Sequence, residues 1–191
     1  MKELRGTETE KNLLKAFAGE SQARTRYTYF ASQANKDGYK QIEAIFLETA
    51  ENEKEHAKRF FKYLEGRPLE ITATFPAGRI GTTEENLLAA AEGEHEEHAE
   101  LYPEYADIAE KEGFPEIAET FRKIAEVEVE HEKRYLKLLD NIRNDRVFKK
   151  DEVVRWKCRN CGYVYEGTAA PELCPACLHE RKYFELKENN Y

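Results

Sequence analysis

The feature that most constrains the fold of this 191-residue chain is an internal repeat with an offset of 75 residues. When the sequence is shifted by that offset, residues 38–65 superpose on residues 113–140, and both apolar and charged positions match. General similarity between helices would explain the apolar matches, but it would not readily repeat a pair of metal-ligating residue types. Each copy carries the motif Glu-x-x-His, as Glu53…His56 and Glu128…His131. The repeat therefore predicts two related halves that contribute to one kind of chemistry.

The spacing of apolar residues predicts that residues 7–143 are almost entirely helical. Apolar side chains recur at intervals of three and four, as at Leu13, Leu14 and Phe17. The pattern is broken at 36–38, in the Gly- and Pro-containing stretch 66–81, and at 111–115. Four long helices in a bundle follow, over roughly 8–36, 39–65, 82–111 and 114–143.

Two helix starts carry a recognisable cap. Thr7 and Thr82 are the expected N-cap residues, and Glu10 and Glu85 follow three residues later as capping-box partners. Pro103 lies inside the third predicted helix, and we expect it to kink that helix locally because it lacks a backbone N–H.

Carboxylates and imidazoles are expected to meet inside the bundle. Side chains three residues apart lie on one helix face, and the neighbours of both Glu-x-x-His motifs on that face are apolar. Antiparallel helices bring two residues to one height when the turn lies midway between them. The midpoint of Glu20 and Glu53 falls in the break at 36–38, and that of Glu94 and Glu128 falls at 111. Buried carboxylates without cations are unfavourable, so a metal is the natural occupant.

The pattern of these candidate ligands is that of a di-iron carboxylate site, with one Glu from each of two helices and Glu-x-x-His from the other two. The six symmetric candidates are Glu20, Glu53, His56, Glu94, Glu128 and His131. Glu97 follows Glu94 by three residues and faces the same way, whereas its counterpart in the first half is Ala23. Glu97 is therefore a seventh candidate and makes the pocket asymmetric. Mixed oxygen and imidazole ligands favour iron or manganese.

Chance is the competing explanation in a chain this acidic, because many Glu pairs three residues apart line solvated helix faces. A third Glu-x-x-His, Glu92…His95, is interpreted as such an accident: it lies two residues from Glu94, on nearly the opposite face, and has no repeat counterpart. His98, one turn after Glu94, is a candidate for a peripheral position or for one beside the metal ligands.

All four cysteines fall in the last 34 residues, as two Cys-x-x-Cys pairs. They are Cys158, Cys161, Cys174 and Cys177. Two Cys-x-x-Cys turns, called knuckles, can bring four thiolates around one metal ion. Their spacing alone does not distinguish zinc from iron. The neighbouring Trp156, the run Cys-Gly-Tyr-Val-Tyr-Glu-Gly and the pair Cys-Pro-Ala-Cys resemble rubredoxin, which favours one iron. Leu178 stands where rubredoxins usually have Gly, and a left-handed conformation there would cost about 1–2 kcal/mol.

Composition excludes several classes of protein. With 38 acidic against 30 basic residues, the net charge of −8 lacks the basic excess of a nucleic-acid binder. No apolar run approaches the length that spans a bilayer, and the first residues have no apolar core of a secretory signal. Thiols grouped as metal ligands favour a reducing compartment, so a cytoplasmic protein is expected.

A ferritin-like di-iron bundle followed by a rubredoxin-like domain, in this order, resembles the rubrerythrin family over essentially the whole chain. The resemblance implies a mainly α fold, with a four-helix ferritin-like domain at 1–145, a linker at 146–152 and a small rubredoxin-like β/knuckle domain at 153–191. It also implies two Fe bound by the seven Glu and His candidates and one Fe bound by the four cysteines. Tyr27 and Tyr102 match tyrosines that lie beside the iron ligands in the family, although aromatic core residues would also suit these positions.

The activity that the resemblance implies is peroxidase: hydrogen peroxide is reduced to water, in defence against oxidative stress in an anaerobe or microaerophile. Electrons would come from a reductase drawing on NAD(P)H, or from a rubredoxin, through the four-thiolate iron. A homodimer or higher homo-oligomer is expected, because a chain's own two centres would lie far apart. The alternatives are a ferritin-like ferroxidase or iron-storage protein, a zinc-ribbon binding module and a di-iron oxygenase.

Overall fold

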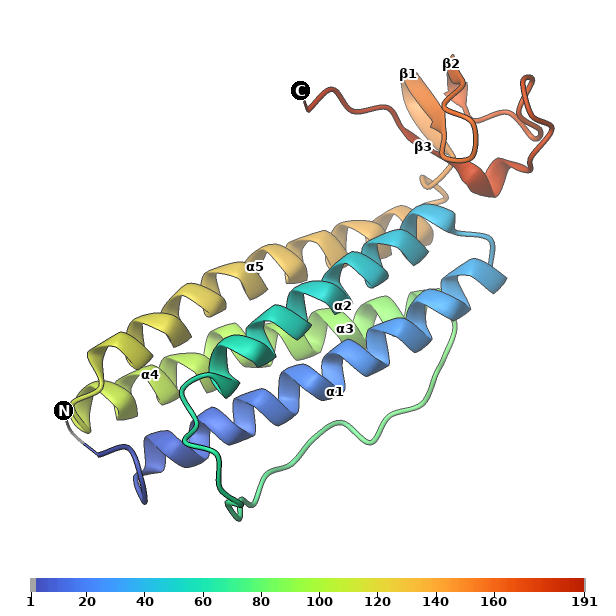
Figure 1. Ribbon diagram of the computed structural model, residues 1–191. Coiled ribbons are helices and arrows are strands. Elements are labelled where there is room, and N and C mark those ends of the chain that lie inside the picture. The colour runs from blue at the N-terminus through green and yellow to red at the C-terminus, as the bar shows by residue number, and fades with distance from the viewer. Residues whose placement is uncertain (1–2, 191) are drawn as a thin grey trace.

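The computed structural model describes residues 3–190 and consists of a long helical bundle with a small sheet at one end (Figure 1). Three of the helices are uninterrupted: α1 (Glu8–Lys36), α2 (Lys40–Phe61) and α5 (Pro115–Arg143). The remaining one is built from α3 (Thr83–Glu96), a π-helical turn η1 (Glu97–Leu101) and α4 (Tyr102–Lys111). The predicted four-helix, mainly α fold is confirmed.

Pro103 was expected to kink the third helix, and the structure instead has a π-helical turn immediately before it. The backbone N–H of Tyr102 donates to the carbonyl of Glu97, five residues earlier, and Pro103 then occupies the first turn of α4. Proline has no N–H to donate to a carbonyl four residues back, so a wider turn before it accommodates the missing donor. As a result, the π turn begins at the seventh candidate ligand.

The two predicted N-caps are both present, but only one is a complete capping box. Thr82 accepts from the backbone N–H of Glu85, whose carboxylate accepts in return from the N–H of Thr82. Thr7 likewise accepts from the N–H of Glu10, 3.1 Å away. The Glu10 carboxylate, however, accepts from the N–H of Gly6 and pairs with Arg67, both at 2.7 Å. This ion pair ties the start of α1 to the segment that follows α2.

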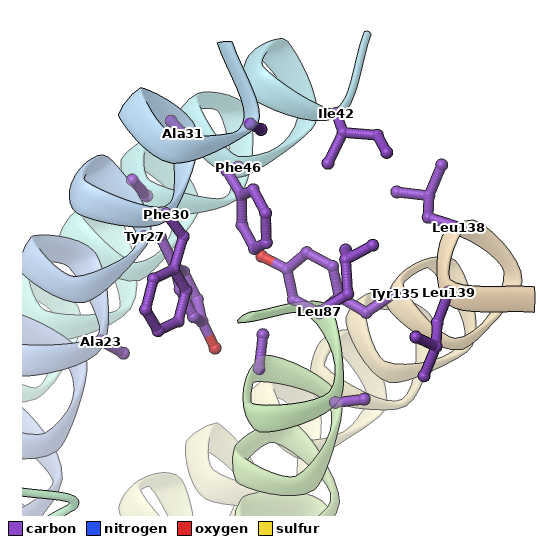
Figure 2. Close-up of a cluster of buried hydrophobic side chains, with 14 residues drawn as sticks. Ala23, Tyr27, Phe30, Ala31, Ile42, Phe46, Leu87, Tyr135, Leu138 and Leu139 are labelled. Atoms are coloured by element: carbon purple, nitrogen blue, oxygen red, sulfur yellow. The ribbon is translucent and has the colours of Figure 1, made fainter. Parts of the chain in front are cut away.

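Two apolar clusters fill the bundle, one toward each end. The first contains Tyr27, Phe30, Phe46 and Tyr135, whose rings pack face to edge or tilted against one another (Figure 2). The second includes Leu13, Phe60, Tyr102, Phe121 and Ile124. Along each helix the candidate ligands fall between the residues of these two clusters. Apolar packing therefore surrounds a short polar layer in the middle of the bundle.

The segment 62–82 between α2 and α3 has no regular structure and runs along the outside of α1 (Figure 1). It is held there by specific contacts: the side-chain amide of Gln22 donates to the carbonyl of Pro76 at 2.7 Å. At its end, the Asp37 carboxylate accepts from both the N–H and the hydroxyl of Thr83. The segment forms one wall of a cavity described below.

The C-terminal part is a three-stranded antiparallel sheet in the order β2-β1-β3. Its strands are β1 (Lys149–Cys158), β2 (Val164–Ala169) and β3 (Phe184–Leu186), with a 3₁₀ turn η2 (Arg181–Tyr183) before β3. Trp156 is fully buried beneath the sheet and donates its indole N–H to the carbonyl of Gly167 at 3.0 Å. β1 begins within the segment that was predicted as linker. The small domain meets the bundle where Tyr39 stacks on Phe148.

None of the helices in the described part of the chain combines the length and the apolar character that crossing a bilayer requires.

Candidate metal centres

Six of the predicted ligands meet in the middle of the bundle, as two overlapping groups of ligand atoms. One group comprises Glu20, Glu53, His56 and Glu128, and the other comprises Glu53, Glu94, Glu128 and His131. Within each group all ligand atoms lie within 4.8 Å of one another. Glu53 and Glu128 belong to both groups. Each group is the size of one metal site, so the two shared carboxylates are placed to bridge two ions.

The distances show how the two bridging carboxylates divide their oxygens. His56 Nδ1 lies 2.9 Å from Oε1 of Glu128 and 3.0 Å from Oε2 of Glu53. His131 Nδ1 lies 2.7 Å from the other oxygen of Glu128 and 3.3 Å from the other oxygen of Glu53. Each shared carboxylate thus turns one oxygen toward each imidazole, an arrangement that suits two ions side by side.

Many polar atoms in this layer have no hydrogen-bond partner, although their residues are buried. Among the described residues, these atoms are Glu20 Oε2, Glu53 Oε1, Glu94 Oε2, both oxygens of Glu128 and Nδ1 of His131; the close approaches of Glu128 to the two histidines do not have hydrogen-bond geometry. Desolvated polar groups without partners cost several kcal/mol each, and desolvated charges cost more. Cations that accept these lone pairs would remove the penalty. The donor set of carboxylates and imidazoles therefore fits a pair of iron ions.

In the metal-free layer, burial and neighbouring charges shift the pKa values of the glutamates in opposite directions. Burial, together with the charge of Glu53, raises the pKa of Glu94 to about 8. Burial also raises the pKa of Glu20 well above its ordinary value. Burial alone would raise the pKa of Glu53 as well, but contacts with His131 and His56 outweigh it and lower that pKa to about 2. Metal binding must therefore displace protons from part of the layer.

The two predicted tyrosines are arranged symmetrically around the layer. The Tyr27 hydroxyl donates to Oε1 of Glu94 at 2.5 Å, and the Tyr102 hydroxyl donates to Oε1 of Glu20. In both glutamates the oxygen left without a partner is Oε2. Each tyrosine therefore occupies one oxygen of a carboxylate and leaves the other free for an ion, which also fixes the orientation of the carboxylate.

Glu97 stands apart from the other six candidate ligands and belongs to neither group. It is the first residue of the π turn, and its carboxylate borders a cavity of about 380 Å³ between α1, η1 and the segment 62–82. Burial and the charges of Glu20 and Glu94 raise the pKa of Glu97 well above its ordinary value. Gly19, Phe75 and Tyr102 also line the cavity. The cavity therefore leads from the surface to side chains that touch the metal ligands.

Neither the cavity nor its wall was predicted from the sequence. A Cβ added to Gly19 would lie 3.6 Å from the Phe75 ring and 3.9 Å from the Glu97 carboxylate. The signal that could have pointed here is the repeated Gly-Glu pair, Gly19-Glu20 and Gly93-Glu94, because glycine in a helix interior costs about 1 kcal/mol relative to alanine. At Gly19, the segment that carries Phe75 lies against α1 at ordinary contact distance.

The four cysteines converge at the end of β1 and in the loop before η2. Their sulfurs form one group within 4.8 Å, with Sγ–Sγ distances of 3.8 Å for Cys158–Cys177 and 3.6 Å for Cys161–Cys174. All four thiols are free of disulfides. The backbone N–H of His179, as the leading influence, lowers the pKa of Cys177 to about 6. Four sulfurs in this arrangement fit one tetrahedrally bound ion.

The two cysteine knuckles have matching backbone turns but different residues in them. The N–H of Gly162 donates to the carbonyl of Cys158 at 2.8 Å, and the N–H of Leu178 donates to that of Cys174 at 2.9 Å. Gly162 has φ 81° and Leu178 has φ 59°, both in the left-handed region. The expectation of a left-handed non-glycine residue at Leu178 is confirmed.

Comparisons with known proteins agree with both parts of the chain. The sequence model of the rubrerythrin family matches residues 11–139, and that of the rubrerythrin rubredoxin-like domain matches residues 156–185. Rubrerythrin of Porphyromonas gingivalis is 62% identical, covering 100% of this chain and 95% of that protein. Rubrerythrin of Nitratidesulfovibrio vulgaris is 59% identical, covering both chains fully, at 100%.

Solved structures show the same architecture. Nigerythrin in its fully reduced, all-ferrous state matches with a TM-score of 0.64 at 30% identity, covering 97% of this chain and 89% of that one. A bacterioferritin of Desulfovibrio desulfuricans shares the bundle, with a TM-score of 0.63 at 24% identity over 73% of this chain and 82% of that one. The chain therefore belongs to the rubrerythrin family, with a di-iron carboxylate site in its ferritin-like bundle and a single iron in its rubredoxin-like domain.

Proposed function

We propose that this protein is a cytoplasmic peroxidase that reduces hydrogen peroxide to water at the di-iron site, with electrons relayed through the four-thiolate iron. The observation that carries the proposal is the presence in one chain of three features. These are a pocket suited to two bridged ions, a surface cavity lined by Glu97 and Tyr102 beside that pocket, and a separate four-thiolate site. An external reductase or a rubredoxin would supply the electrons.

The residues that would hold the metals follow from the contacts. Glu53 and Glu128 would bridge the two ions, because each turns one oxygen toward each histidine. The terminal ligands would be Glu20 and His56 for one ion, and Glu94 and His131 for the other, with Glu97 as an additional ligand from the cavity side. Cys158, Cys161, Cys174 and Cys177 would hold the third iron.

When bound, the two ferrous ions supply the two electrons that cleave the O–O bond, and the four-thiolate iron returns electrons one at a time. Reduction of one peroxide to two waters also consumes two protons. The Glu97 carboxyl borders the cavity, so it would lie where peroxide arrives. Tyr102 lines the same cavity, and its hydroxyl donates to Glu20, which keeps that carboxylate oriented while substrate enters.

Peroxidase and ferroxidase activity are separated by a rapid-mixing experiment on the iron-loaded, reduced protein under anaerobic conditions. Separate samples are mixed with one equivalent of hydrogen peroxide or of dioxygen, and consumption of each oxidant is followed. We expect peroxide to react at least about 10-fold faster than dioxygen, a difference of about 1.4 kcal/mol in barrier. Faster reaction with dioxygen, accompanied by uptake of further ferrous ions into a ferric deposit, would instead establish an iron-storage function.

We further propose that the working unit is a homodimer in which each rubredoxin-like domain serves the partner's bundle. Glu128 lies fifteen residues before Arg143, about 22 Å along α5 at 1.5 Å per residue. The small domain lies beyond that end of the bundle (Figure 1). An antiparallel pair related by a two-fold axis would shorten the path between centres.

Mixed dimers test this arrangement. One subunit carries Cys158→Ser with Cys174→Ser, and the other carries Glu53→Ala with Glu128→Ala. Each pure dimer should be inactive with a donor that acts through the four-thiolate iron, whereas the mixed dimer should recover activity. A purified mixed dimer that stays inactive, although both intact sites hold iron, would show that transfer occurs within one chain.

A further inference from the structure

A second cluster of metal-binding side chains lies on the surface of the bundle, separate from the two groups of the di-iron layer. It consists of His95 near the end of α3, His98 in η1 and Glu132 in α5. His95 Nδ1 lies 3.0 Å from Oε1 of Glu132, and His98 Nε2 lies 2.6 Å from Oε2 of the same carboxylate. Two imidazoles from one segment therefore converge on the two oxygens of one carboxylate.

The geometry of this cluster suits one ion. Its three ligand atoms lie within 4.8 Å of one another, and the two rings stand edge to face with centroids 5.1 Å apart. Ligands about 2.1 Å from a tetrahedral zinc ion are about 3.4 Å apart. The nitrogen–oxygen separations of 3.0 and 2.6 Å are shorter, so small side-chain rotations that widen them would admit the ion. The side chain of His95 is 58% exposed, against 15% for His98 and 20% for Glu132, so water could complete the coordination.

The residues adjacent to this cluster in sequence belong to a different site. Glu94 and His131, which adjoin His95 and Glu132 in sequence, belong to the buried di-iron layer. Glu92, which forms the third Glu-x-x-His with His95, is exposed and is not a member of the surface cluster. His95 instead has Glu132 of α5 as its carboxylate partner.

We propose that His95, His98 and Glu132 form a surface site for a divalent transition-metal ion. Two imidazoles and one carboxylate with open positions are the donor set that proteins use for zinc and for ferrous iron. A bound ion would join η1 to α5. Because η1 also carries Glu97, the ion would restrain the segment that borders the cavity of the di-iron site.

The test uses the full-length, iron-loaded protein in its oxidised form, with Zn²⁺ as the probe. Equilibrium dialysis followed by metal analysis should show about one zinc per chain with no loss of iron. The X-ray absorption spectrum at the zinc edge should show two imidazoles. Substituting His98→Gln or Glu132→Gln should weaken zinc binding by about 10-fold or more while the iron content stays the same.

Glu92→Gln is the matched control, because it removes a nearby exposed carboxylate without touching the cluster. It should change zinc affinity by less than about 2-fold. The proposal is wrong if the unmodified protein retains no extra zinc, if zinc uptake is matched by loss of iron, or if Glu92→Gln weakens binding as much as Glu132→Gln.

Discussion

Replacing Leu178 by glycine should stabilise the rubredoxin-like domain. Leu178 has φ 59°, a left-handed conformation that costs a non-glycine residue about 1–2 kcal/mol. Glycine removes that cost but loses about 0.5–1 kcal/mol through the greater entropy of the unfolded chain. The Leu178 side chain is 73% exposed, so little buried apolar area is lost with it. The net stabilisation should be about 0.5–1 kcal/mol.

The ferric four-thiolate centre is coloured, so its bleaching in guanidinium reports opening of this domain without interference from the bundle. A gain of 0.5–1 kcal/mol lowers the open population about 2- to 5-fold, and bleaching should slow by the same factor when opening precedes iron loss.

Gly162 supplies the matched control, because it occupies the corresponding turn of the other knuckle with φ 81°. Gly162→Leu should accelerate bleaching, as it introduces the strain that Leu178→Gly removes. If Leu178→Gly bleaches at the same rate as the unmodified protein or faster, the left-handed turn is not strained and the reasoning is refuted.

Five further predictions concern the bundle. Gly19→Ala should raise the free energy of unfolding by about 1 kcal/mol and preserve turnover, because its Cβ meets only ordinary contacts. Gly19→Leu should fill the cavity and lower kcat/KM for peroxide about 10-fold at unchanged iron content. Tyr102→Phe should cost about 1–3 kcal/mol in chemical unfolding, since it leaves an oxygen of Glu20 without its donor. Glu97→Ala should retain two irons in the bundle by metal analysis and lose peroxide turnover; full activity would exclude a role for this side chain. The raised pKa of Glu94, about 8 against an ordinary 4.5, implies a stabilising contribution that is complete below pH 4.5 and lost as the pH rises through 8. Calorimetry of the metal-free protein should therefore show this loss, and titration with Fe²⁺ should show affinity rising over the same range.

Features that depend on local sequence were predictable. The helix ends near Gly38 and Gly113 coincide with breaks in apolar spacing, and both glycines have positive φ. The repeat also identified the six residues that meet in the polar layer, because a matched offset and a matched turn position constrain antiparallel helices strongly. Here periodicity, turn chemistry and spacing all indicate the same arrangement.

Features that depend on packing between distant segments were not predictable. The position of segment 62–82 along α1 rests on contacts such as Gln22 with Pro76, which leave no periodic signal. Glu10 was expected to complete a capping box, but Arg67 from that segment competes for its carboxylate. The convergence of His98 on Glu132 likewise depends on how η1 and α5 pack.

Oxidation of the four-thiolate iron by peroxide tests most directly whether the two centres work together. The reduced, iron-loaded protein is mixed rapidly with hydrogen peroxide, and the return of the ferric colour is followed. The Glu53→Ala, Glu128→Ala double variant is measured beside it after metal analysis confirms that its four-thiolate iron is present. The proposed mechanism predicts rapid recolouring in the unmodified protein and recolouring at least about 100-fold slower in the variant, a difference of about 2.7 kcal/mol in barrier. Equal rates in the two proteins would mean that peroxide oxidises the four-thiolate iron directly, and would contradict the proposed route through the di-iron site.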